Sequence, residues 1–215
     1  MFFRTLLLSL AAAVLTAAPH AASAGEIAGF GDSFVLPTGE PWVLPEGIEL
    51  VTTIRSYNPL DPETCKRPDE ETPKQLGIPT GQVRVCLQFL NTDQRRPIDV
   101  QLPPGLVVIS ESQKNQNGLV VQQVTLEVPS SEYLFAPILA DCLNSSRSAP
   151  GIGDLYRIGP VTDVPDIQEA LRLLADKDLS DPFDSAEASN VLKPLYLGKP
   201  LTKDGRDRIA ALPLR

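Results

Sequence analysis

The sequence predicts a mainly β protein with an α-helical C-terminal part: an antiparallel immunoglobulin-like β-sandwich, followed by two to three short helices that pack on it. Two observations carry this prediction. Up to about residue 150, short segments in which apolar and polar residues alternate are separated by turn-forming residues. Beyond that point, apolar residues recur at the spacing of one helix face.

The N-terminus, residues 1–24, has the features of a secretory signal peptide: a basic residue at Arg4, an uncharged apolar run and small residues before a cleavage position. We expect cleavage between Ala24 and Gly25. The apolar run covers residues 5–18, fewer than the roughly 20 that span a bilayer, which favours a removed leader over an anchor. No later stretch is long and apolar enough to span. The compact, alanine-rich leader is typical of bacteria, so we predict a periplasmic or secreted protein.

Alternation of apolar and polar residues predicts several short strands. The clearest begins at Val83 and ends at Phe89, with its apolar residues facing the core. Further strands are expected over residues 48–54, 98–102, 106–109, 119–128 and 133–140. Asn117-Gly118 predicts a hairpin turn, because both residues tolerate positive φ. Many short strands with prolines at their edges are typical of an antiparallel sandwich, which we assign to residues 25–150.

Three motifs between residues 83 and 143 follow one another in a distinctive order. A strand that ends in Phe89-Leu90-Asn91 precedes Leu102-Pro103-Pro104-Gly105-Leu106, and Val128-Pro129 introduces a late strand. This order resembles the prolyl-glycyl immunoglobulin-like sandwich repeats of bacterial surface proteins. The resemblance covers about 60 residues; it implies the sandwich fold and implies no activity.

Residues 58–80 form a long, acidic, proline-rich connection within the predicted sandwich. Its carboxylates are candidate ligands for a cation such as calcium: Asp61, Glu63, Asp69, Glu70 and Glu71. These residues lack the Asp-x-Asp-x-Asp-Gly spacing of a defined calcium loop, so a solvated insertion is the favoured interpretation. We therefore predict neither a metal nor another cofactor.

The C-terminal region, residues 151–215, is expected to be helical. Helix starts are indicated by Val164-Pro165, by Asp181-Pro182 and by Thr202, because proline suits the first turn and Asp or Thr can cap it. Each helix has one apolar face, so we expect the helices to pack on one another or on the sandwich.

Three cysteines, Cys65, Cys86 and Cys142, predict one disulfide and one leftover thiol in an oxidising compartment. We favour Cys65–Cys142, because both residues lie in connections that can adjust to the bond geometry. Cys86 is then free, and Cys86–Cys142 and Cys65–Cys86 stay open as alternatives. Without a histidine base, a leftover thiol is expected to be a buried spectator.

The only histidine, His20, lies in the predicted leader, so the mature chain has none. This excludes Ser-His-Asp and Cys-His catalysis and every His-ligated metal site. Loss of Arg4 with the leader takes the formal net charge from −8 to −9, so nucleic acid is not an expected partner. Asn144-Ser145-Ser146 is formally a glycosylation sequon, of little meaning in a bacterial protein.

We therefore predict no enzymatic activity and no catalytic residues. The expected function is that of an exported, non-enzymatic protein that binds another macromolecule, a protein partner in the bacterial cell envelope or outside the cell. One alternative is a carboxylate-based hydrolase or carbohydrate-active protein. Its acidic residues would come from those in or beside the sandwich: Glu111, Glu127, Glu132, Asp141 and Asp154. The other alternative is a protein that binds a cation or small ligand between the sandwich and the helices.

Overall fold

The computed structural model of the chain describes residues 26–51, 53–58, 60–66, 71 and 74–215. The predicted signal peptide, its cleavage position at Ala24 and Gly25, and the acidic residues Asp69 and Glu70 lie outside these ranges. Within the described ranges, the helices are too short and too polar to cross a membrane.

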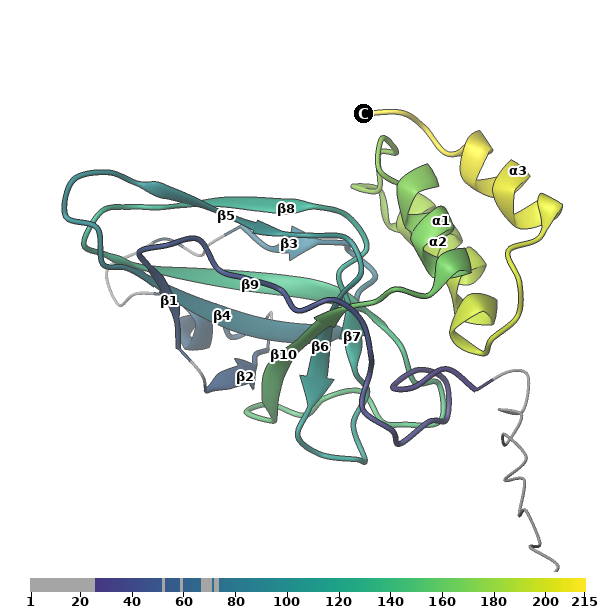
Figure 1. The fold of residues 1–215 in the computed structure, drawn as a ribbon, viewed down its shortest axis with the longest axis horizontal. Coiled ribbons are helices and arrows are strands. Elements are labelled where there is room, and N and C mark those ends of the chain that lie inside the picture. The colour runs from purple at the N-terminus through teal and green to yellow at the C-terminus, as the bar shows by residue number, and fades with distance from the viewer. Residues whose placement is uncertain (1–25, 52, 59, 67–70, 72–73) are drawn as a thin grey trace, which may run out of the picture.

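The structure is mainly β with three C-terminal helices, as the sequence predicts (Figure 1). The strands are β1 (Ile48–Leu50), β2 (Ile54–Ser56), β3 (Leu76–Gly77), β4 (Val83–Asn91), β5 (Ile98–Leu102), β6 (Leu106–Ser110), β7 (Gly118–Leu119), β8 (Val124–Val128), β9 (Tyr133–Cys142) and β10 (Leu155–Val161). The helices are α1 (Pro165–Leu173), α2 (Pro182–Tyr196) and α3 (Lys203–Ala211), and a 3-10 turn, η1, covers Pro62–Cys65.

Six of the strands close into a barrel in the order β4-β2-β10-β6-β7-β9, because β9 pairs back onto β4. β5 and β8 form a separate antiparallel ribbon whose apolar residues join the barrel core. The strands thus form a closed barrel with a ribbon beside it, where we expected the two sheets of an immunoglobulin-like sandwich. The cause is the length of β4 and β9, which pair with each other over eight positions and still reach different partners on their other edges.

Strand β10 is absent from our sequence prediction, which assigned residues 151–215 to helices. It pairs with β2 and β6, and Tyr156 is fully buried in the barrel core. Its Gly159-Pro160 pair is unusual within a strand, since proline cannot donate to a ladder, and this pair concealed the strand. The barrel therefore extends to Val161, and the helical part begins at Pro165.

The predicted alternation of β4 is confirmed, with every second residue from Val83 to Asn91 buried. In β6, four successive residues are buried instead. Leu106 and Val108 belong to the barrel core, whereas Val107 and Ile109 belong to a second core that the helices share. The apolar run of β6 is thus explained by burial of both of its faces.

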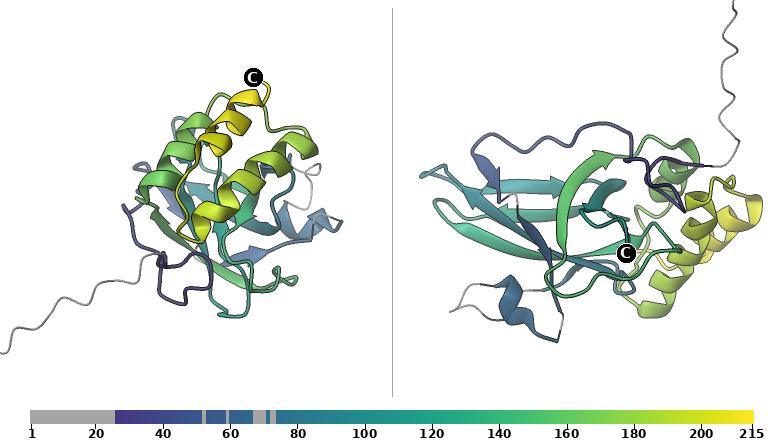
Figure 2. Two further views of the ribbon diagram at one scale, coloured as in Figure 1. Left: turned by 90° about the vertical axis from the view of Figure 1, so that its right-hand side faces the viewer. Right: turned by 90° about the horizontal axis from the view of Figure 1, so that it is seen from below.

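The three helices pack together at one end of the barrel (Figures 1 and 2). Their predicted starts are confirmed: the Asp181 side chain accepts a hydrogen bond from the N–H of Phe183, and that of Thr202 accepts one from Gly205. The apolar faces of the helices meet the outer surface of β6 and β7 in the second core. The helices are therefore held by burial against the barrel wall.

The disulfide joins Cys65 to Cys86, so our preferred pairing of Cys65 with Cys142 is wrong. The turn η1 folds back on β4 and β9 and brings Cys65 to Cys86, with a Cα–Cα distance of 5.5 Å. Cys142 carries a free thiol at the end of β9. The loop that we expected to be a solvated insertion is thus fixed to the barrel at this point.

The described part of the acidic loop gives no metal site. Asp61 and Glu71 are exposed, and Glu63 lies in η1. Within the described ranges, no group of three or more His, Cys, Asp or Glu residues is placed to hold a metal ion.

Two buried asparagines connect the N-terminal segment to the barrel. Asn144 donates to the carbonyls of Gly29 and Gly31 at 3.1 and 3.0 Å and accepts from the N–H of Asn117 at 2.8 Å. Asn117 also donates to Gly29, at 3.0 Å. The predicted hairpin turn at Asn117-Gly118 is wrong, because Gly118 begins β7 and pairs with Cys142.

Candidate functional site

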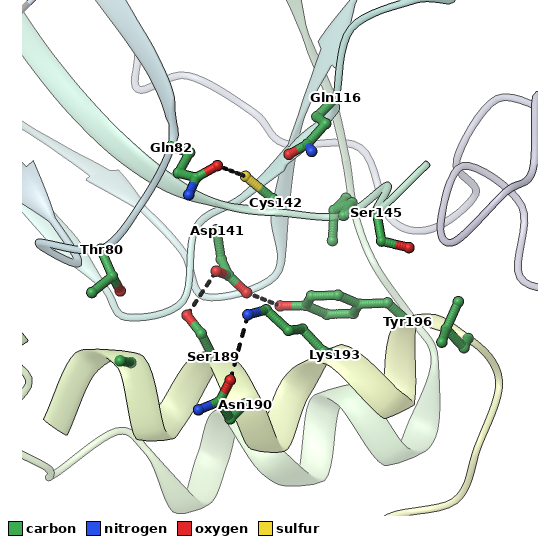
Figure 3. Close-up of a pocket in the computed structure, with 13 residues that line it drawn as sticks. Thr80, Gln82, Gln116, Asp141, Cys142, Ser145, Ser189, Asn190, Lys193 and Tyr196 are labelled. Carbon is green, nitrogen blue, oxygen red and sulfur yellow. Dashed lines mark hydrogen bonds between the residues drawn. The ribbon is translucent and has the colours of Figure 1, made fainter. Parts of the chain in front are cut away.

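A pocket of about 470 Å³ lies where the end of β9 meets α2 (Figure 3). The end of β9 supplies Asp141 and Cys142, and the connections around the barrel supply Thr80, Gln82, Gln116, Leu143 and Ser145. Helix α2, with the residue that follows it, supplies Ala186, Ser189, Asn190, Lys193, Tyr196 and Leu197. The helical residues recur at intervals of three or four, so they share one face of α2. One wall of the pocket is therefore barrel and the other is helix.

Asp141 connects these two walls. Its side chain is buried, and its two oxygens accept hydrogen bonds from Ser189 Oγ and from Tyr196 Oη, each at 2.8 Å. Burial raises the pKa of Asp141 above its ordinary value of 3.8, and the two hydrogen bonds oppose this shift. Burial, together with the nearby Asp141 charge, also raises the pKa of Tyr196 well above its ordinary value of 10. The carboxyl group is thus engaged in fixing α2 to the barrel.

We expect the wild-type protein to gain stability relative to the Asp141→Asn variant as the pH falls from neutral towards the ordinary aspartate pKa of 3.8. Because the pKa of Asp141 is raised on folding, the folded state binds this proton more tightly than the unfolded state does. The contribution of Asp141 to the free energy of unfolding therefore grows as the pH falls through the pKa that Asp141 has in the folded protein. The same contribution is lost as the pH rises through that pKa. Urea unfolding of both proteins across this range measures the difference.

The variant also serves as the control in this experiment, because the other carboxylates titrate in both proteins. Glu169 and Glu187, whose pKa values are lowered first by hydrogen bonds from Arg206 and Arg208, destabilise both proteins equally on acidification. A difference in unfolding free energy that does not change with pH would contradict the burial of an ionisable group at position 141.

Cys142 lies beside Asp141 with its Sγ 3.9 Å from Gln82 Oε1. Burial, reinforced by the Asp141 charge, raises the pKa of the Cys142 thiol to about 11. The thiolate is the reactive form of cysteine, so a thiol with this pKa is a weak nucleophile at neutral pH.

Two polar groups of the pocket have bonding capacity left. Gln116 is 8% exposed, and its Nε2 donates to the carbonyl of Arg147 at 2.8 Å, while its Oε1 is buried without a hydrogen-bond partner among the described residues. Lys193 is exposed, and its Nζ donates to Asn190 Oδ1 at the long distance of 3.4 Å. These groups lie on opposite walls of the pocket (Figure 3).

Of the five carboxylates considered for hydrolysis, Asp141 alone lines this pocket. Glu111, Glu127 and Glu132 are exposed. No second carboxylate among the described residues lines the pocket, so this part of the chain does not offer the paired acid and base of a glycoside hydrolase there.

The polar residues of α2 that line the pocket were not among the predicted site residues, because the apolar spacing of that helix indicates only its buried face. On that apolar face Val191 and Leu195 are buried, whereas Phe183, at the start of the helix, is 86% exposed. The available signal was Ser189 and Lys193, four residues apart and therefore on one side of the helix.

No protein-family model, curated protein or solved structure matches this chain. The geometry of the pocket is therefore the basis for a functional proposal.

Proposed function

We propose that this chain is an exported, non-enzymatic binding protein whose ligand occupies the pocket between β9 and α2. The observation that carries the proposal is the convergence of Lys193, Gln82 and Gln116 on one cavity of about 470 Å³. Small-ligand sites are concave, mainly apolar and carry a few convergent polar groups, with volumes of roughly 300–1,000 Å³. Apolar atoms of Leu143, Ala186 and neighbouring residues supply the rest of the lining.

The hydrogen bonding of Asp141 and the protonation state of Cys142 favour binding over catalysis. Both oxygens of Asp141 accept hydrogen bonds, and the Cys142 thiol stays protonated because burial raises its pKa. The chain after residue 20 has no histidine to activate either group.

Export is supported by the leader-like residues 1–24 and by the disulfide between Cys65 and Cys86, since such bonds persist in oxidising compartments. Production in a bacterial host with the leader intact tests this part of the proposal. The expected result is a periplasmic protein whose N-terminal residue is Gly25, and a cytoplasmic, uncleaved product would contradict it.

The ligand proposal is tested by filling the pocket. Ala186 lines the cavity, so Ala186→Trp is expected to occupy it, whereas Ala210→Trp places the same side chain on the exposed surface of α3. A thermal-shift screen of small polar molecules should find compounds that stabilise the wild type and Ala210→Trp and do not stabilise Ala186→Trp. Equal stabilisation of all three proteins, or of none, would argue against the pocket as the binding site.

A second candidate function, binding of a protein partner, is favoured by a separate observation. Phe34, Val35 and Leu36 are 63%, 64% and 59% exposed in succession. The guanidinium of Arg147 lies 4.8 Å from the centre of the Phe34 ring. Contiguous exposed apolar residues bordered by polar ones are typical of protein interaction surfaces. Cross-linking of the mature protein in envelope extract, compared between the wild type and Val35→Asp, tests this role.

A further inference from the structure

The barrel wall of the pocket presents hydrogen-bond acceptors. Because Gln116 Nε2 is held by the carbonyl of Arg147, the orientation of the amide is fixed, and Oε1 is the atom that no described residue pairs with. Figure 3 shows this oxygen turned towards Cys142. Gln82 Oε1 receives only the weak thiol contact from Cys142. An N–H donor on a ligand would satisfy an acceptor that the protein leaves unpaired, and buried unpaired acceptors are costly.

The helix wall presents a cation. Lys193 is the only basic residue that lines the pocket in the described part of the chain. An ammonium has three donors, and the long bond to Asn190 leaves most of this capacity available to an anionic group.

Asp141 is the acidic neighbour of this cation. Among the described residues it is the only acidic one in the lining; both of its oxygens accept hydrogen bonds from α2, and the Lys193 ammonium beside it (Figure 3) acts to lower its pKa. The Cys142 thiol, the other titratable group of this wall, is neutral at ordinary pH because burial raises its pKa. The exposed ammonium at α2 and the acceptor oxygens at the barrel therefore suit a molecule with its negative end at α2 and its N–H groups at the barrel.

We infer that the ligand carries a carboxylate that pairs with Lys193 and an N–H donor that reaches Gln116 Oε1, which is the chemistry of an amino acid or of the C-terminal residue of a peptide. This inference rests on the proposed function of the same pocket. A volume of about 470 Å³ lies at the lower end of the range for small-ligand pockets and suits one or two residues. Leu143, Ala186 and Leu197 provide an apolar surface for the ligand's side chain.

Calorimetric titration with defined probes tests the inference. The probes are the free L-amino acids, N-acetyl dipeptides with a free C-terminal carboxylate, and the same dipeptides as C-terminal amides. We expect at least one carboxylate probe to bind and its amide to bind at least about tenfold more weakly. Tighter binding of the acetylated dipeptide than of the free amino acid identifies a peptide C-terminus as the source, and binding of the free amino acid alone identifies a free amino acid.

Matched variants assign the two contacts. Lys193→Gln and Gln116→Leu should each weaken binding by at least about tenfold, whereas the exposed controls Lys199→Gln and Gln101→Leu should leave it within about twofold. Lys193 is exposed, so its variant is expected to fold, and it tests the carboxylate contact even if Gln116→Leu is unstable.

The outcomes separate this inference from the proposed function. If no carboxylate probe binds, but a compound of another class stabilises the wild type and not Ala186→Trp, the inference is overturned and the binding function stands. If no compound stabilises the wild type while leaving Ala186→Trp unaffected, both the proposed function and this inference fail. Binding of a carboxylate probe that is unaffected by Lys193→Gln also overturns the inference.

Discussion

Replacing Asn144 with alanine is expected to lower the free energy of unfolding by about 3 kcal/mol, because it leaves buried backbone groups unpaired at roughly 1–3 kcal/mol each. The Asn144 side chain is fully buried. Its loss removes the acceptor of the Asn117 N–H and a donor to the Gly31 carbonyl. The Gly29 carbonyl keeps its bond from Asn117 Nδ2.

Urea unfolding, followed by tryptophan fluorescence and by circular dichroism, measures this loss. Asn190→Ala is the matched control, because Asn190 is exposed on α2 and its removal is expected to change stability by about 0.5 kcal/mol or less. Similar effects of the two substitutions would show that the N-terminal segment is not held by Asn144. The burial of Asn144 also predicts that this sequon is not glycosylated in the folded protein.

Removing the disulfide with the double substitution Cys65→Ala and Cys86→Ala is expected to cost about 3 kcal/mol of stability. The two residues are 21 positions apart, and a bond that closes a loop of this size restricts the unfolded chain by about that amount. Cys65 is also 1% exposed, so its replacement removes buried contacts in addition.

Cys142→Ala is the control for this experiment, and we expect it to cost less than about 1 kcal/mol because Cys142 is only half-buried and forms no disulfide. Mass spectrometry of a non-reduced digest identifies the linked peptides directly. A peptide that joins Cys142 to either of the other cysteines, or a large loss of stability in Cys142→Ala, would contradict the pairing.

Alternation of apolar and polar residues and helix-capping residues were sufficient to predict a strand and the starts of two helices. The alternation from Val83 to Phe89 predicted β4, and the Asp181 and Thr202 caps predicted the starts of α2 and α3. These features depend on neighbours a few residues away, where side-chain direction follows directly from spacing.

Features that depend on distant partners were not accessible in this way. Barrel closure requires β10 to pair with β2 and β6, and Gly159-Pro160 masks the strand. The pocket depends on Asp141 meeting Ser189 and Tyr196, which are 48 and 55 residues further along the chain. Periodicity indicates which face of α2 is buried, but it does not indicate which strand end that face will meet.

The late position of β10 also has a consequence for how the chain folds. Ile54 in β2 and its partner Tyr156 are separated by the whole remainder of the barrel sequence, so the barrel cannot close until β10 has emerged. Pairings of this range carry a high loop-closure cost and are typical of folding in milliseconds to seconds. Until then, β2 and β6 present unpaired edges that can associate with other chains. Synthesis or translocation that stalls before residue 155 would therefore leave an open, aggregation-prone sheet.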